Sequence, residues 1–278
     1  MKTPDDFLGA CVSVLREKNP LVHHITNYVT ANDCANIVLA AGGSPVMADD
    51  EGECVEITVH AAALAINIGT LNERTVLSML KSGGCANELG IPVIFDPVGV
   101  GASPMRGRAA ERLLSEVRFA VVRGNASEIF HIAYGKSGTK GVDVGEGERA
   151  SSLEALEDAA QVVATRFGCV VAVTGAVDVV LGGAGVCHIA NGHPEMGRIT
   201  GSGCMCTSLI ASFLGAGLDP FAAAVSGVAL MGVAGELAFE RCGERGTGSF
   251  RTGIVDAVSC MTDDELAGRA TISWTKRA

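Results

Sequence analysis

Short apolar runs alternate with longer helix-like segments along most of this chain. The short runs with the composition of buried strands are Leu64–Ile68, Pro92–Phe95, Phe119–Val122, Cys169–Val173 and Val186–Ile189. The longer segments with the pattern of helices are Asp5–Lys18, Thr30–Ala40, Asn72–Leu89, Pro104–Glu116, Ser151–Phe167, Gly203–Leu214, Pro220–Arg241 and Ile254–Leu266. Strands that are apolar on both faces and separated by helices form parallel sheets covered on both sides. We therefore expect an α/β fold with three layers, in which helices cover both faces of a mostly parallel sheet.

Nothing in the sequence divides the chain into separate units. No Pro- or Ser-rich linker, internal repeat or shift of composition interrupts residues 1–278, which predicts a single domain. Hydrophobic residues make up 48 % of the chain but aromatic residues only 4 %, so aliphatic side chains must build the core. Gly135–Glu148 is polar and glycine-rich, which indicates a loop or a hairpin.

Charge and composition argue against several classes of partner. The formal net charge is −10 and no run of Lys or Arg occurs, so we expect neither nucleic acid nor an anionic membrane as partner. Phe221–Gly235 carries no charge but is shorter than the ~20 residues that span a bilayer, which favours a buried helix. The N-terminus lacks the apolar run of a signal peptide, and the cysteines lack the spacing of a zinc site or a disulfide framework. These features predict a cytoplasmic protein with reduced thiols.

Polar residues follow the predicted strands at the points where they end. In a parallel sheet, ligands bind outside the carboxyl ends of the strands, so these residues should meet at one edge. They are Asn67 and Gly69, Asp96, Arg123 and Asn125, Thr174, and a glycine turn at Gly201. Their convergence predicts a binding site.

The turn Thr200-Gly-Ser-Gly-Cys204 runs straight into an apolar helical segment. Glycine lets the backbone approach a ligand closely, and the free N–H groups and dipole of a helix N-terminus attract anions. We predict that Gly201, Ser202 and Gly203 form an anion hole for a phosphoryl group, with Cys204 directed at it. The alternative for the glycines is a plain tight turn, and the alternative for Cys204 and Cys206 is that they are small core residues. Residues two apart on a helix point in different directions, so one of the two cysteines can face the core and the other the turn. A helix N-terminus should lower the pKa of the thiol that faces the turn, whereas a nearby polyphosphate would raise that pKa.

The common nucleotide-binding motifs are missing. Gly135-Lys-Ser137 looks like the end of a P-loop, but Phe130 stands where that motif requires glycine. No G-x-G-x-x-G opens a helix after a strand with an acidic residue about 20 positions further on. A nucleotide must therefore be held in another way.

The charged candidates each admit a structural and a functional interpretation. Asp96 either caps the turn over residues 97–101 or holds Mg²⁺ through water. Asn125-x-x-Glu128 has the spacing of a capping box, and Glu128 can serve the metal at the same time. Arg123 is a solvated strand end or supplies positive charge to an anionic ligand.

Several blocks of sequence, taken together and in this order, resemble the hydroxyethylthiazole kinase family. The blocks are Pro20–Asn32 (PLVHHITNYVTAN), Ala41–Asp49 (AGGSPVMAD), Phe95–Gly101 (FDPVGVG), Arg123–Glu128 (RGNASE) and Thr200–Cys204 (TGSGC). The resemblance implies a ribokinase-like fold and the phosphorylation of the primary hydroxyl of 4-methyl-5-(2-hydroxyethyl)thiazole by MgATP, in thiamine biosynthesis or salvage. It also implies a homotrimer with the thiazole site at the subunit interface.

The resemblance assigns roles to individual positions. ATP would be bound by Arg123, Asn125 and Thr174, Mg²⁺ by Asp96 and Glu128, and the thiazole alcohol by Asn27, Met47 and Gly201. On pattern alone Met47 is a packing residue, and His23 and His24 are structural histidines. Ribokinase-like enzymes generally have an Asp base at this position. This chain has Cys204 there instead, and known hydroxyethylthiazole kinases also have a cysteine. Cys204 would therefore orient or deprotonate the hydroxyl.

Other functions within and outside this fold remain as alternatives. They are a kinase for hydroxymethylpyrimidine or pyridoxal, an ATP-dependent hydrate dehydratase, and a non-catalytic thiazole- or nucleotide-binding protein. The blocks around Asn27 and Met47 favour the thiazole, and Cys204 disfavours the dehydratases, which typically have Asp there. A binding protein would not need the carboxylates of Asp96 and Glu128.

Overall fold

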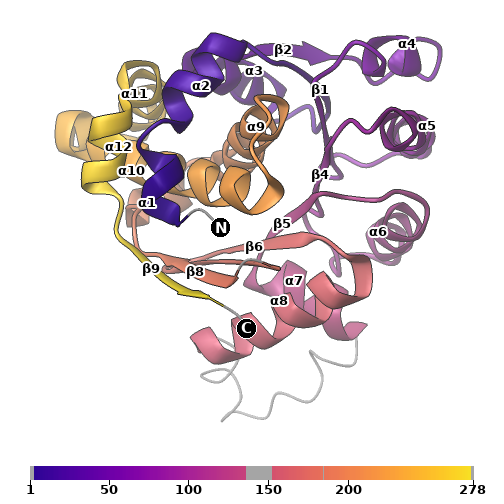
Figure 1. Ribbon diagram of the computed structural model, residues 1–278. Helices are drawn as coiled ribbons and strands as arrows, with labels where there is room; N and C mark the ends of the chain where they lie inside the picture. The colour runs from indigo at the N-terminus through magenta and orange to yellow at the C-terminus, as the bar shows by residue number, and fades with distance from the viewer. Residues whose placement is uncertain (1–2, 136–151, 184, 277–278) are drawn as a thin grey trace.

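A computed structural model describes residues 3–135, 152–183 and 185–276 of the chain. A nine-stranded sheet crosses the molecule in the order β2-β1-β3-β4-β5-β6-β7-β8-β9 (Figure 1). The strands are β1 Leu21–Ile25, β2 Ser44–Met47, β3 Ala63–Asn67, β4 Val93–Asp96, β5 Val121–Asn125, β6 Val170–Thr174, β7 Asp178–Gly182, β8 Gly185–Ile189 and β9 Ile272–Lys276.

The sheet is parallel from β2 to β6 and antiparallel from β6 to β9. The prediction of a mostly parallel sheet is therefore confirmed, and five of its strands begin within two residues of the predicted positions. The predicted strand ranges did not include β1, β2, β7 or β9. Parallel pairing brings the carboxyl ends of β3 and β4 level, with Asn67 opposite Asp96, and those of β5 and β6, with Asn125 opposite Thr174.

Helices cover both faces of the sheet (Figure 1). The helices are α1 Pro4–Leu8, α2 Cys11–Lys18, α3 Ala31–Ala41, α4 Cys54–Thr58, α5 Glu73–Leu89, α6 Pro104–Glu116, α7 Ala126–Tyr134, α8 Leu153–Phe167, α9 Ser202–Gly215, α10 Pro220–Cys242, α11 Thr247–Cys260 and α12 Asp263–Arg269, with short 3₁₀ helices η2 Pro194–Arg198 and η3 Gly243–Arg245. Helices α1 to α3 and α9 to α12 lie on one face, and α5 to α8 lie on the other. This is the predicted three-layer α/β/α arrangement.

Two hydrophobic clusters, one on each face, show why the strands are apolar on both sides. Along β3, Ala63 and Ala65 belong to the cluster under α9 and α10, whereas Leu64 and Ile66 belong to the cluster under α5 and α6. Successive side chains of a strand point to opposite faces, so a strand covered on both sides must be apolar at every position.

Two predicted helices are each two helices in the structure. Asp5–Lys18 was expected as one helix, but Gly9 and Ala10 interrupt the helical conformation between α1 and α2. Ile254–Leu266 was also expected as one helix, but Met261 is extended and the side chain of Thr262 caps α12 by accepting the N–H of Glu265 at 3.1 Å. Apart from Gly135, the predicted loop or hairpin Gly135–Glu148 lies outside the described residues.

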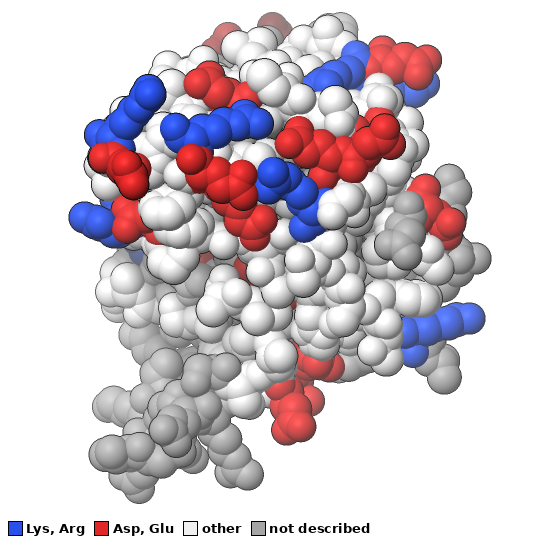
Figure 2. Space-filling model, turned by 90° about the vertical axis from the view of Figure 1, so that its left-hand side faces the viewer, with Lys and Arg blue, Asp and Glu red and all other residues white. Residues whose placement is uncertain are grey.

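The apolar segment Phe221–Gly235 is part of α10, which packs against α9 and α11 in the middle of one layer. Residues 220–245 pass the length and composition test for a membrane span, but 94 % of their most apolar window is buried inside the protein. On the face that carries α11 and α12, Lys and Arg lie interspersed with Asp and Glu (Figure 2).

Candidate active site

A cavity of about 920 Å³ opens at the carboxyl ends of the parallel strands. Of the predicted site residues, those that line it are Asn27, Arg123, Asn125, Glu128, Thr174, Gly201, Ser202, Gly203 and Cys204. The expected convergence of strand ends on one edge is therefore confirmed. Asp96 lies beneath this surface, and Met47 is not part of the lining.

The glycine turn forms the start of α9, as predicted. Gly201 is the N-cap residue with a φ of 89°, a conformation that favours glycine. A Cβ on Gly201 would lie 2.9 Å from Cγ2 of Thr30, and a Cβ on Gly203 would lie 2.5 Å from Nη1 of Arg123. Gly201 is thus required by its backbone conformation, and the first turn of α9 faces the cavity with the guanidinium of Arg123 packed against Gly203.

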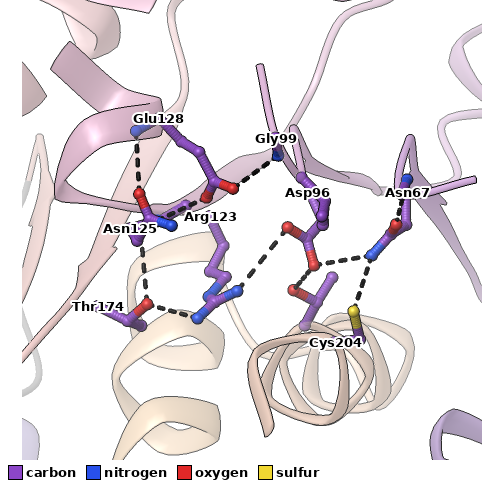
Figure 3. A network of polar contacts seen from close by, with 12 residues as sticks. Asn67, Asp96, Gly99, Arg123, Asn125, Glu128, Thr174 and Cys204 are labelled. Atoms are coloured by element: carbon purple, nitrogen blue, oxygen red, sulfur yellow. Dashed lines mark hydrogen bonds and ion pairs between the residues drawn. The ribbon is translucent and has the colours of Figure 1, made fainter. Parts of the chain in front are cut away.

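Arg123 supplies positive charge at the centre of the site. It is only 8 % exposed, so the alternative of a solvated strand end is wrong. Its guanidinium donates a hydrogen bond to Oγ1 of Thr174, and Nη1 lies 3.8 Å from Oδ1 of Asp96 (Figure 3). A buried guanidinium and a helix N-terminus this close together can bind one anion jointly.

Asp96 is fully buried at the end of β4. Its Oδ2 accepts hydrogen bonds from Nδ2 of Asn67 at 3.0 Å and from Oγ1 of Thr207 at 2.8 Å. Among the described residues no donor hydrogen-bonds to Oδ1, and none from the 97–101 turn bonds to either oxygen, so the turn-cap interpretation is wrong. Burial raises the pKa of Asp96 to about 6, against the opposing charge of Arg123.

Asn125 and Glu128 form the capping box that their spacing predicted. Oδ1 of Asn125 accepts the N–H of Glu128 at 3.0 Å, and Oε2 of Glu128 accepts the N–H of Asn125 at 2.8 Å. Oε1 of Glu128 also accepts the N–H of Gly99 at 2.8 Å, which joins the start of α7 to the loop after β4 (Figure 3).

The carboxylates suit a magnesium ion better than a metal held by protein alone. No group of three or more His, Cys, Asp or Glu side chains with metal-site geometry occurs within the described residues. Mg²⁺ binds through one or two carboxylates, keeps several waters and takes its remaining ligands from phosphates. Oδ1 of Asp96, which accepts no hydrogen bond from the described residues, fits such a site, and Glu128 lies near enough to affect the Asp96 pKa.

The sulfur of Cys204 receives two amide donors. Nδ2 of Asn27 lies 3.3 Å from Sγ and Nδ2 of Asn67 lies 3.2 Å from it. Burial and the charge of Asp96 raise the pKa of the thiol, so the expected lowering by the helix N-terminus does not prevail. Cys206 also borders the cavity but is 3 % exposed and packs in the core.

Met47 is the predicted site residue that the structure does not bring to the cavity. It ends the edge strand β2 with 37 % of its surface exposed, opposite His24 of β1. His23 and His24 are structural, as predicted. His23 contacts Oγ1 of Thr58 and the carbonyl oxygen of Ala48, and Nε2 of His24 lies 3.1 Å from Oγ of Ser208.

Several residues of the site were not among the predicted ones. Thr207 lies three positions after Cys204 and shares its helix face, a spacing that could have indicated its contact with Asp96. Asn67 was recognised only as a strand end. Asp178 borders the cavity, accepts the N–H of Gly175 at 2.8 Å and has a pKa raised by burial to about 6. Arg106 donates to the carbonyl oxygens of residues 68, 69 and 98, and nothing in the sequence indicates this.

Known proteins with similar sequences are hydroxyethylthiazole kinases. A family model described as "Hydroxyethylthiazole kinase family" matches residues 12–264. Hydroxyethylthiazole kinase of Ruminiclostridium cellulolyticum is 51 % identical over 262 residues, which cover 94 % of this chain and 95 % of that protein. The chain belongs to the hydroxyethylthiazole kinase family. The same enzyme from Clostridium beijerinckii is 51 % identical over 92 % of this chain and 93 % of its own length.

Solved structures support the assignment to the hydroxyethylthiazole kinase family. Hydroxyethylthiazole kinase from Pyrococcus horikoshii superposes with a TM-score of 0.86 at 37 % identity, covering 97 % of this chain and 99 % of that one. Pyridoxal kinase from Staphylococcus aureus, bound to AMP-PCP and pyridoxal, gives a TM-score of 0.58 at 12 % identity, over 77 % of this chain and 86 % of that one. That second likeness shows a shared fold alone. The comparisons thus support the thiazole kinase over the alternative substrates, and the predicted ribokinase-like kinase is confirmed.

Proposed function

We propose that this kinase transfers the γ-phosphoryl group of ATP to the primary hydroxyl of 4-methyl-5-(2-hydroxyethyl)thiazole, in thiamine biosynthesis or salvage. The observation that carries the proposal is the turn Gly201–Cys204, which starts α9 in the same cavity as the buried guanidinium of Arg123. Phosphoryl transfer needs little covalent chemistry from the protein, so catalysis consists mainly of alignment and charge stabilisation.

The phosphate end of the site comprises Arg123, Asn125 and Thr174 at the ends of β5 and β6, together with the anion hole of α9. The backbone N–H groups of Ser202 and Gly203 and the helix dipole stabilise the charge that spreads over the transferring group. Arg123 adds a full positive charge, and its bond to Thr174 holds the guanidinium in place. Asp96 and Glu128 would hold Mg²⁺, largely through water. When bound, the ion would neutralise part of the negative charge of the ATP phosphates.

The alcohol end comprises Asn27, Gly201 and Cys204. Both Asn27 and Cys204 border the cavity, and the amide of Asn27 donates to the sulfur. In this position Cys204 orients the hydroxyl of the thiazole, or takes its proton late in the reaction, when the attacking oxygen has begun to bond to phosphorus.

A homotrimer would complete the thiazole site. Met47 lies outside the cavity of a single chain and is exposed at the edge of the sheet, so it can contact a ligand held between subunits. Large apolar side chains near that edge are also exposed: Tyr28 by 59 %, Val29 by 63 % and Leu39 by 58 %. We propose that these residues are covered by a neighbouring subunit, and that the enzyme works as a single-domain protein in the cytoplasm.

A substrate panel tests this function. Purified protein is assayed with MgATP and hydroxyethylthiazole, hydroxymethylpyrimidine or pyridoxal, and kcat/KM is compared. We expect the thiazole to have the highest value and the reaction to stop when Mg²⁺ is chelated. A higher value for either other alcohol would reject the proposed substrate, and phosphorylation without Mg²⁺ would reject the metal.

A further inference from the structure

Asn67 lies at the carboxyl end of β3 and uses all of its amide's hydrogen-bonding positions. Its Oδ1 accepts the N–H of Gly69 at 2.9 Å and Nδ2–H of Asn27 at 3.1 Å. Its Nδ2 donates to Oδ2 of Asp96 at 3.0 Å and to Sγ of Cys204 at 3.2 Å (Figure 3). The side chain is only 4 % exposed, so water cannot easily replace a partner that is lost, and losing one of these hydrogen bonds is costly.

The partners fix the orientation of this amide. The backbone N–H of Gly69 can only donate, so it requires the amide oxygen, and the carboxylate of Asp96 requires the nitrogen. A flipped amide would put two donors together at Gly69 and two acceptors together at Asp96. The N–H of Asn67 is therefore directed at the sulfur of Cys204, which also receives Nδ2–H of Asn27 at 3.3 Å.

Asn67 thus joins the two ends of the proposed reaction. On one side it binds Asp96, whose other oxygen lies near Arg123 at the phosphate end. On the other side it binds Cys204 and Asn27 at the alcohol end. It makes no hydrogen bond to the proposed ATP contacts Arg123 and Thr174.

We propose that Asn67 is a positioning residue, which holds the sulfur of Cys204 at a fixed place relative to Asp96 and so aligns the acceptor hydroxyl with the transferring phosphoryl group. This inference rests on the role proposed above for Cys204. A misalignment of about 1 Å can cost roughly 100-fold in rate, even when binding is unchanged. Loss of Asn67 should therefore lower kcat and leave the KM for ATP nearly unchanged.

Two variants test this role. Asn67→Ala removes the whole amide. Asn67→Asp keeps the shape and the acceptor oxygen, but it replaces the amide nitrogen, which lies 3.0 Å from Oδ2 of Asp96, with a carboxylate oxygen and so also perturbs Asp96. We expect kcat to fall by about 10- to 100-fold in both, with the KM for ATP within about twofold of wild type. The control is Asn87→Ala, which removes a comparable amide that bonds to the backbone of Arg118 outside the cavity. The control should keep the wild-type kcat.

A double-mutant cycle separates positioning from a general structural role. In a Cys204→Ala background, Asn67→Ala should lower kcat by no more than about threefold, because the sulfur that Asn67 positions is gone. An equal loss in both backgrounds, or a fall in Tm with unchanged kcat, would overturn the inference. Cys204→Ala is also measured alone. A full kcat there would refute the role of Cys204 itself, whereas an impaired Cys204→Ala with additive losses would refute only the coupling to Asn67.

Discussion

Gly203→Ala should weaken ATP binding by displacing Arg123 without damaging the helix. The added Cβ would lie 2.5 Å from Nη1 and 2.9 Å from Nη2 of the guanidinium, and ordinary contact begins near 3.4 Å. The guanidinium must therefore retreat by about 0.9 Å. Because the guanidinium is buried and hydrogen-bonded to Thr174, we expect this movement to disturb its position at the phosphate end of the site.

The expected magnitude follows from the proposed contact of Arg123 with ATP, which this displacement would remove. A hydrogen bond to a charged group contributes about 1.5–3 kcal/mol, so the KM for ATP should rise roughly 10- to 150-fold. The backbone itself should not suffer, because Gly203 is a helical residue without a positive φ and Ala is favoured over Gly in helices by about 1 kcal/mol. Tm should consequently change by less than about 4 °C.

The assay measures the KM for ATP, kcat and Tm for Gly203→Ala and for the control Gly84→Ala. Gly84 is also a helical glycine, within α5, but a Cβ there would meet nothing within 4 Å. The control should leave the KM for ATP unchanged and Tm equal or slightly higher. If Gly203→Ala also leaves the KM for ATP unchanged while the protein stays folded, the proposed contact of Arg123 with ATP is wrong.

Further substitutions test the remaining groups of the site. Cys204→Ala should lower kcat by at least about tenfold, and Cys204→Asp should retain more activity than Cys204→Ala because a carboxylate can also accept the proton; equal rates for all three proteins would exclude a role in proton transfer. Arg123→Ala should mainly raise the KM for ATP, by about tenfold or more, in steady-state assays. Burial holds the pKa of Asp96 at about 6 against a usual value of 3.8, so the folded protein binds more protons between these values, and the free energy of unfolding should fall as pH rises from about 4 to about 6. The raised pKa of Asp178 contributes to this fall in the same direction. Asp96→Asn should abolish activity and make the free energy of unfolding depend less on pH in denaturant titrations. An unchanged pH dependence would contradict the assigned burial of Asp96.

Local signals explain which elements could be predicted from the sequence. Pro104–Glu116 begins and ends where the pattern placed it, because Ser103 caps the helix and accepts the N–H of Arg106. The capping box of Asn125 and Glu128 was equally clear. The edge strands gave no such signal. β9 is largely exposed and β2 has no fully buried position, so neither has the apolar run that marks a central strand.

The site was predictable in outline because strand ends of a parallel sheet converge, but its electrostatics were not. The burial of Asp96 depends on Thr207, which lies 111 positions away along the chain, and on Arg123 of the neighbouring strand. The raised pKa of Cys204 likewise depends on burial that only the packed structure defines. The place of Met47 was not predictable either. Its role as a ligand contact came from the family resemblance, and in a single chain it lies outside the cavity.

The most direct test of the central claim follows the phosphoryl group itself. The purified enzyme is incubated with Mg²⁺, hydroxyethylthiazole and ATP that carries heavy oxygen in its γ-phosphoryl group, and the products are analysed by mass spectrometry. The account predicts that the labelled group appears on the hydroxyl of the thiazole, one thiazole phosphate forming for each ATP consumed. Labelled inorganic phosphate with unmodified thiazole, or no consumption of ATP, would contradict it.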